Sequence, residues 1–243
     1  PVRLAHPEGV AVHEDGSVWC GTENGEICRI EVDGKAMTAV ASTDGFIAGL
    51  AFDADGKLYA CDICHGCIFR LDPKSGSLER FGTASLRIPN YPVVDSARNA
   101  LYVSDSFSFE EHGPGVWRFD LTSGEAELWY DEPMAFANGM ALTLDGSALL
   151  VVESLTCSLS RINISSDGAA GERKTVADGL AEFPDGVAID AAGRIYVSCY
   201  EPSQIYRLST SGQPDILIRD PVATLISHPT NMAFRGSKMM TTN

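Results

Sequence analysis

Basic residues are scarce in this sequence. Its 243 residues include 18 Lys and Arg against 33 Asp and Glu, which gives a formal net charge of −15 and a pI near 4.6. Such a surface repels phosphate groups, so nucleic acids and anionic membranes are excluded as expected partners, whereas cations are favoured. We expect a small-molecule partner instead, and the sequence gives no indication of the oligomeric state.

Long apolar runs are also missing. No stretch approaches the roughly 20 apolar residues of a membrane span, and the N-terminal PVRLAHPEG has neither the basic nor the apolar part of a signal peptide. The seven cysteines form an odd set in a chain too large to need disulfide staples, which favours a reducing compartment. We therefore predict a cytoplasmic protein, although a chain that starts without Met is also compatible with a trimmed leader.

A sustained helical period is the third absence, because segments such as GAAGERKTVADGL contain glycine and polar residues where apolar ones are needed. The sequence does contain an internal repeat. Its six copies begin at His6, Phe46, Ile88, Phe136, Phe183 and His228. In each copy a short apolar run, a turn often of the Asp-Gly type and a second apolar run predict a β-hairpin.

The spacing of 40 to 48 residues leaves room for two further strands after each hairpin, as in EICRIEV and AMTAVA of the first copy. Four antiparallel strands per copy, repeated around a channel, are typical of a β-propeller. We predict an all-β, six-bladed β-propeller that forms a single domain over residues 1–243. Only 13 residues follow Thr230, so we expect an incomplete sixth blade and a sequence cut short relative to the natural protein.

One position at the start of the first strand changes its residue type from copy to copy. The aligned residues are Glu8, Ala48, Asn90, Asn138, Asp185 and Thr230. The next residue is glycine in four of the six copies, so the backbone requirement is constant while the side chain varies. This pattern favours a ligand site over a repeated turn. Because the first strand of each blade lines the channel, we expect Glu8, Asn90, Asn138 and Asp185 to converge at one end.

Two carboxylates and two amide oxygens in a narrow channel need a positive counter-charge. A divalent hard cation supplies one, and calcium fits such oxygen ligands best. Magnesium and manganese also accept oxygen ligands, and zinc, which prefers His or Cys, is a further alternative.

Three stretches resemble the metal-binding motifs of the gluconolactonase and regucalcin (senescence marker protein) family, which are six-bladed, calcium-dependent β-propeller hydrolases. They are PEGVAV with Glu8, FANGMALTLDG with Asn138 and FPDGVAID with Asp185. The resemblance spans nearly the whole chain and implies that these three residues bind the metal. It also implies that Asp185 is the acid/base or the nucleophile, and that Asn90 contacts metal or substrate, as the matching residue does in diisopropylfluorophosphatase.

The sequence departs from this family around Asn90. Family members usually have Asp directly after this Asn, whereas Tyr91 follows here. An Arg that holds a sugar often lies two residues before the Asn, and here Arg87 lies three residues before it. We keep Arg87 and Asn90 as expected substrate contacts, together with His228, which precedes the last copy of the variable position.

The predicted function is a metal-dependent lactonase, a carboxylic ester hydrolase in which the metal polarises the carbonyl and Asp185 moves a proton or attacks. Aryl-ester or organophosphate hydrolysis is an alternative. GTENGEICRI and FANGMALTLDGSALLVVES also resemble strictosidine synthase-like propellers. A non-catalytic binding propeller is the remaining alternative. The loop from Asp105 to Gly115 should lie on the face of the metal site, as a lid or as a solvated loop.

Overall fold

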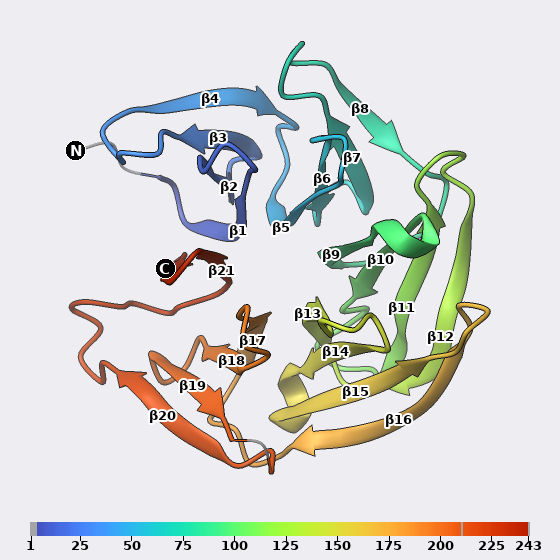
Figure 1. Cartoon of the computed structure of the whole chain (residues 1–243), viewed down its shortest axis with the longest axis vertical. Coiled ribbons are helices and arrows are strands. Elements are labelled where there is room, and N and C mark those ends of the chain that lie inside the picture. The colour runs from blue at the N-terminus through green and yellow to red at the C-terminus, as the bar shows by residue number, and fades with distance from the viewer. Residues whose placement is uncertain (1–3, 210, 243) are drawn as a thin grey trace.

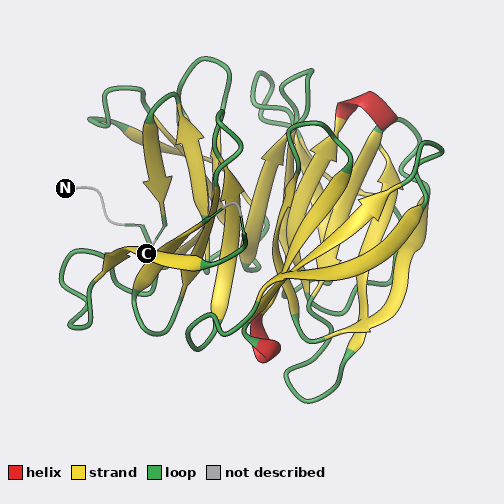
Figure 2. Ribbon diagram, turned by 60° about the horizontal axis from the view of Figure 1, so that its bottom comes forward, coloured by secondary structure: helices red, strands yellow, loops and turns green. Residues whose placement is uncertain are grey.

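Antiparallel β-strands arranged around a central channel make up nearly all of the computed structural model, which describes residues 4–209 and 211–242 (Figure 1). The helical segments of these residues are two single-turn 3₁₀ helices, η1 (Ser96–Arg98) and η2 (Ser154–Thr156). In Figure 2 the strands of neighbouring sheets run side by side, with loops at both ends. The prediction of an all-β propeller is confirmed.

Each complete blade is a four-stranded antiparallel sheet with its strands in chain order. Blade 1 contains β1 (Pro7–Val12), β2 (Val18–Thr22), β3 (Glu26–Ile30) and β4 (Met37–Ser42). Blade 2 contains β5 (Ile47–Phe52), β6 (Leu58–Asp62), β7 (Cys67–Leu71) and β8 (Leu78–Phe81). Blade 3 contains β9 (Pro89–Asp95), β10 (Ala100–Asp105), β11 (Gly113–Asp120) and β12 (Ala126–Met134).

The remaining strands complete two more blades and one hairpin. Blade 4 contains β13 (Ala137–Leu142), β14 (Ala148–Glu153), β15 (Ser158–Ile164) and β16 (Ala170–Ala177). Blade 5 contains β17 (Pro184–Ile189), β18 (Ile195–Cys199), β19 (Gln204–Leu208) and β20 (Pro214–Arg219). The hairpin contains β21 (Met232–Arg235) and β22 (Lys238–Thr241), which pair with each other.

The number of blades differs from the prediction. The structure has five complete blades, not six with an incomplete sixth, because the chain after Thr230 forms only the two-stranded β21–β22 sheet. This hairpin lies between blade 5 and blade 1, and β21 contacts both β17 and β1 (Figure 1). The inner strands β1, β5, β9, β13, β17 and β21 thus follow one another around the channel.

Tight turns join the inner strand of each blade to the next strand. In the turn between β1 and β2, Gly16 adopts φ 84°, and Gly56 adopts φ 79° between β5 and β6. Other residues rarely adopt this left-handed backbone, which explains the Asp-Gly pairs of the repeat.

The hydrophobic core consists of separate layers between neighbouring sheets. Between blades 1 and 2, Trp19 and Ile27 pack with Ile47 and Leu50. An equivalent layer joins Val152 of blade 4 to residues of blade 5. Burial of these side chains holds the faces of successive blades together.

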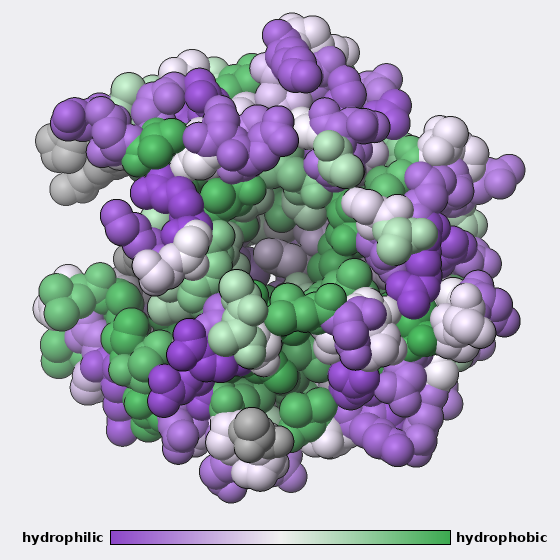
Figure 3. All heavy atoms as spheres, in the orientation of Figure 1, coloured by the Kyte–Doolittle hydropathy of each residue, from purple (hydrophilic) through white to green (hydrophobic). Residues whose placement is uncertain are grey.

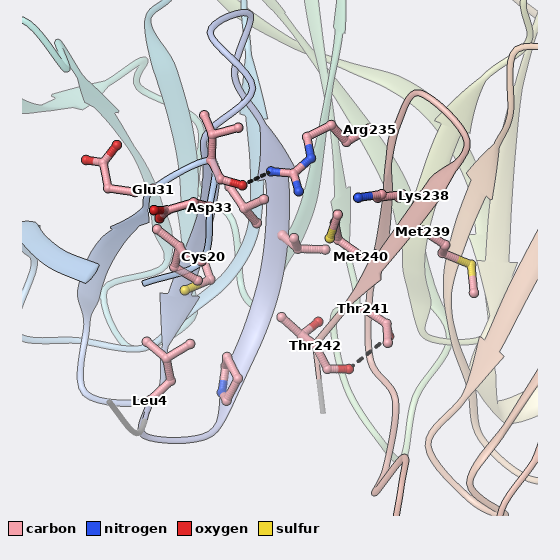
Figure 4. A pocket seen from close by; sticks show the side chains of 16 residues that line it. Leu4, Cys20, Glu31, Asp33, Arg235, Lys238, Met239, Met240, Thr241 and Thr242 are labelled. Carbon is pink, nitrogen blue, oxygen red and sulfur yellow. Dashed lines mark hydrogen bonds between the residues drawn. The ribbon is translucent and has the colours of Figure 1, made fainter. Parts of the chain in front are cut away.

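Apolar side chains also line the channel beyond its first residues, and they surround the opening seen in Figure 3. This part of the channel encloses about 280 Å³ and is lined by Leu50, Phe52, Met140 and Phe234 among others. A larger cavity of about 780 Å³ lies between blade 1 and the β21–β22 hairpin (Figure 4). Within the part of the chain that the structure describes, no helix has the length and apolar character needed to cross a membrane.

Candidate active site

The variable position of the repeat occupies the same place in every complete blade. Glu8, Asn90, Asn138 and Asp185 are each the second residue of their inner strands β1, β9, β13 and β17, and Ala48 takes this place in β5. All inner strands begin at the same end of the channel, because each blade repeats the same connection. The predicted site residues therefore start at one end of the channel.

Glycine after the variable position lets neighbouring inner strands approach closely. A Cβ built on Gly139 would lie 2.6 Å from the carbonyl oxygen of Asp185, and one built on Gly9 would lie 2.6 Å from that of Ala48. Both distances are too short for any other residue, and both contacts are with backbone atoms of the next blade. The glycines thus bring the variable side chains of adjacent blades together.

The charge of Glu8 acts on Asp185 at this end of the channel. Burial raises the pKa of Asp185 well above its usual value, the charge of Glu8 raises it further, and hydrogen bonding from Asn138 opposes both effects. Burial also raises the pKa of Glu8 to about 7, against a hydrogen bond from Thr230. The structure therefore brings Glu8, Asn138 and Asp185 together.

Neither carboxylate has a strong basic partner among the described residues. The ion pairs there give Glu8 only His6, whose Nδ1 lies 3.8 Å from Oε1, and they give Asp185 none. Two buried acids without a compensating charge are unfavourable when ionised. This end of the channel is thus suited to a bound cation.

A serine fixes the orientation of the Asn138 amide. The Ser154 hydroxyl donates to the carbonyl oxygen of Pro184 at 2.6 Å, so it accepts from Nδ2 of Asn138, 3.1 Å away. The amide oxygen must then face the other way. Asn138 Oδ1 is buried and has no hydrogen-bond partner in the described part of the chain. An unpartnered buried oxygen on a residue that neighbours Asp185 is available as a cation ligand.

The donor atoms fit a hard divalent cation, since they are carboxylate and amide oxygens. Across residues 4–209 and 211–242, no three His, Cys, Asp or Glu side chains gather in a way that could hold a metal. This follows from the composition of the site, in which only Glu8 and Asp185 belong to those residue types. A cation at this position would therefore need the asparagine oxygens as ligands as well.

Asn90 has different hydrogen-bond partners from Glu8, Asn138 and Asp185. Its Nδ2 donates to Ser106 Oγ at 3.2 Å, and the Ser106 hydroxyl donates to the carbonyl oxygen of Ala137 at 2.8 Å. In the described residues, no hydrogen bond joins Asn90 to Glu8, Asn138 or Asp185. Asn90 is half-buried at the start of β9, and its role as ligand or substrate contact stays a prediction.

Arg87 and His228, the other expected substrate contacts, lie at the rim. The Arg87 guanidinium is 4.0 Å from the centre of the Phe107 ring and 3.7 Å from the Glu111 carboxylate. His228 Nε2 is 2.8 Å from Glu201 Oε1, and its ring lies 4.6 Å from that of Tyr200. The charges of Glu8 and Asp185 contribute to a raised pKa of Tyr200, after burial, which places this part of the rim near the two acids.

The sequence reasoning missed the residues that orient the site. Ser106 and Ser154 each hold an asparagine amide, and each lies 16 residues after its asparagine. Both follow an acidic residue at the end of the second strand, in the segments VSDS and VVES. Aligning these strand ends across the repeat would have revealed the two serines.

Two family models match the chain. The one described as SMP-30/Gluconolactonase/LRE-like region matches residues 89–242, and the one described as Strictosidine synthase-like, N-terminal, matches residues 3–30. The chain is 26% identical to lactonase drp35 of Staphylococcus haemolyticus over 85% of the chain and 67% of that protein. It is also 26% identical to the protein strictosidine synthase-like 10 of Arabidopsis thaliana, over 72% of the chain and 51% of the relative. The chain thus spans about half to two thirds of the length of these relatives.

Solved structures show the same fold. A gluconolactonase from Xanthomonas campestris superposes with a TM-score of 0.82 at 21% identity, over 99% of this chain and 84% of the other. A calcium-binding regucalcin from Agrobacterium tumefaciens superposes with a TM-score of 0.79 at 19% identity, over 97% of this chain and 80% of the other. At these identities the likeness establishes the propeller architecture alone.

Proposed function

The chain belongs to the SMP-30/gluconolactonase/LRE-like family, and we propose that it is a hydrolase that opens a lactone ring with Asp185 as its acid/base. The observation that carries the proposal is the buried pair of carboxylates, Glu8 and Asp185, beside the unpartnered oxygen of Asn138. The similarity to a lactonase supports this class of reaction over others.

We propose further that Glu8, Asn138 and Asp185 hold a divalent cation, with Asn90 as a fourth ligand or a substrate contact. Calcium suits an all-oxygen site best, magnesium and manganese are the next choices, and zinc suits it least. When bound, such a cation supplies a positive charge that polarises a carbonyl group and compensates the two buried carboxylates.

The residues of the chain account for the proton transfers of hydrolysis. Ionised Asp185 accepts a proton from a water molecule, whose oxygen attacks the lactone carbonyl carbon. The ring C–O bond then breaks, and the leaving alkoxide takes the proton back from Asp185, which gives the open hydroxy acid. Asn138 lowers the pKa of Asp185 and so favours its ionised form, against the effects of burial and of the charge of Glu8. Direct attack by Asp185 on the carbonyl carbon is the alternative role.

The first test is proton release from a panel of lactones at constant pH, with chelator-stripped protein and calcium, magnesium, manganese or zinc added back. We expect turnover that depends on the added cation and is fastest with calcium. Turnover of aryl esters or organophosphates without lactones would select the neighbouring hydrolase activity instead. Calcium binding without turnover of any of these substrates would favour a binding propeller or a synthase-like activity.

The second test is the variant Asp185→Asn, which keeps an oxygen donor but removes the basic group. We expect the lactone kcat to fall by about two to three orders of magnitude, while calcium still binds. A matched control is Asp190→Asn, since Asp190 is also buried, follows the same strand at its far end and contacts Arg194 and Tyr196. Unchanged turnover in Asp185→Asn would remove Asp185 from the mechanism.

A further inference from the structure

Three phenylalanine rings pack against one another at the rim of blades 4 and 5. The ring of Phe109 lies 4.3 Å from that of Phe136 and 6.2 Å from that of Phe183, and the latter two rings are 5.7 Å apart. Phe109 comes from the loop between β10 and β11 of blade 3, so this loop reaches across to the next two blades. We call Phe109, Phe136 and Phe183 the aromatic shelf.

The shelf lies immediately beside the proposed reacting groups. Phe136 is two residues before Asn138, and Phe183 is two residues before Asp185. Both phenylalanines adopt a left-handed backbone, with φ 61° and 55°, which is rare and costly for such bulky residues. His6 and His228, which also lie two residues before the variable position, adopt it too, with φ 36° and 53°. The conformation therefore belongs to the start of the inner strand in these copies, and it fixes where the two phenylalanine rings lie.

Phe109 is exposed although its loop is well anchored. Its exposed fraction is 62%, whereas Phe136 is 4% exposed. The carboxylate of Asp105 accepts hydrogen bonds from the backbone N–H groups of Phe107, Arg87 and Ile88, which ties both sides of the loop base together. An exposed aromatic ring that is presented by an ordered loop beside a polar site is typical of a ligand contact.

Two polar side chains of the rim, Arg87 and His228, have partners within the protein. The Arg87 guanidinium lies over Phe107 and near Glu111, and the His228 ring is held by Glu201. A polyhydroxylated sugar needs several free donors and acceptors at such a rim. The aromatic shelf offers an apolar contact instead.

We propose that the aromatic shelf binds an apolar substituent, aryl or alkyl, on the ring of the substrate, and that the preferred lactones are of this class rather than sugar lactones. The inference rests on the proposed lactone hydrolysis, because it places the carbonyl of the same ligand at Asp185. It adds Phe109 as a residue that determines specificity through contact with the substituent.

The kinetic test compares γ-butyrolactone, γ-phenyl-γ-butyrolactone and glucono-δ-lactone. We expect the highest kcat/KM for the phenyl lactone. In Phe109→Ala this value should fall by about fivefold to tenfold, mainly through KM, while γ-butyrolactone changes by less than about twofold. Leu144→Ala is the matched control, because Leu144 is 64% exposed and follows β13 at the end away from Asn138. A preference for glucono-δ-lactone, or equal effects of the two variants, overturns the proposal.

A binding test measures the contribution of the aromatic shelf to affinity independently of lactone hydrolysis. The γ-phenyl γ-lactam resists hydrolysis, and its affinity can be measured by calorimetry in the parent protein, in Phe109→Ala and in Leu144→Ala. Weaker binding in Phe109→Ala alone supports the shelf, even if no lactone is turned over and the proposed function fails. Equal binding by all three proteins, or no binding while lactones are hydrolysed, overturns the shelf and leaves the hydrolase standing.

Discussion

Glu8 and Asp185 are held in a poorly solvated place where neither finds a lysine or arginine among the described residues. Such a pair stays compatible with folding in one of two ways: the acids keep their protons, or a cation joins them. The raised pKa values of both groups correspond to acids that keep their protons. The unpartnered Oδ1 of Asn138 is an oxygen that a cation could use in the second way.

We predict that the stability of the cation-free protein falls as the pH rises from about 5 to 8. The folded state raises the pKa of Glu8 from 4.5 to about 7 and that of Asp185 well above 3.8, so it binds protons more tightly than the unfolded chain. A group of this kind stabilises the fold below its unfolded pKa, and this contribution is lost as the pH passes the folded pKa. For Glu8 the loss is at most about 3 kcal/mol. Urea unfolding at several pH values, with chelator present, measures it.

Calcium should reverse this dependence of stability on pH, because it binds the ionised carboxylates and adds stability that grows with pH. The control is the double variant Glu8→Gln, Asp185→Asn, in which the slope between pH 5 and 8 should flatten. Surface acids with lowered pKa values, such as Asp72 and Asp145, at about 2 each, titrate below this window. A cation-free protein that is equally stable at pH 5 and pH 8 would contradict the account.

Single residues of the site were predictable to different degrees. The position of Asn138 follows from its place in the repeat, since every copy starts the same strand. The orientation of its amide was not predictable, because it depends on Ser154 and on the Pro184 carbonyl of the next blade. Arg87 was expected to contact the substrate, and its contacts with Phe107 and Glu111 depend on how a long loop folds.

At the level of strands, the site depends on how closely the inner strands pack. The sequence shows glycine after the variable position, but it does not show the reason. The structure supplies it: the next blade places a carbonyl group against that Cα, as Asp185 does against Gly139. Such a contact joins strands almost 50 residues apart, so no local pattern could have predicted it.

We predict that Gly139→Ala lowers both stability and calcium affinity. Its Cβ would lie 2.6 Å from the carbonyl oxygen of Asp185 and from the Cα of Gly186, and backbone atoms of β17 cannot rotate away. Forcing β13 and β17 apart should cost about 1 to 3 kcal/mol of unfolding free energy. It should also separate Asn138 from Asp185. Chemical unfolding and a calcium titration measure the two effects.

Gly171→Ala in β16 is the control for this strand contact. Its Cβ would lie 3.2 Å from the nearest atom, so a small adjustment of the outer strand accommodates it. We expect near-parental stability and unchanged calcium binding. Similar losses in the two variants would show that strand propensity, and not close approach at the channel, explains the glycines.

At the level of the whole molecule, the two ends of the chain meet at the site. The carbonyl oxygen of Glu8 accepts hydrogen bonds from Thr230, Asn231 and Thr242, which lie more than 220 residues away in sequence. The repeat length allowed the propeller to be predicted, because spacing and turn residues are local. The number of blades was wrong, because the last copy forms only the β21–β22 hairpin in the place between blades 5 and 1.

The last part of the chain binds blade 1 at two places, one beside the site and one away from it. One variant at each place separates their effects on stability and on calcium binding. The Thr242 hydroxyl donates to the Glu8 carbonyl at 2.8 Å, beside the site, whereas Arg235 Nη1 donates to the carbonyls of Gly16 and Val32 at 2.9 and 3.2 Å. Figure 4 shows Arg235 and Thr242 among the residues that line the cavity between blade 1 and the hairpin. We predict that Thr242→Val and Arg235→Ala each lower the free energy of unfolding by about 1 to 2 kcal/mol, since each removes hydrogen bonds across the junction.

Only Thr242→Val should weaken calcium binding, because it alone removes one of the hydrogen bonds to the backbone of a proposed ligand. Denaturant unfolding and calorimetric calcium titration of the two variants make the comparison. Equal losses of calcium affinity would mean that the site responds to the stability of the ring as a whole. No loss of stability in either variant would show that packing of β21 against β1 and β17, and not these hydrogen bonds, joins the ends of the chain.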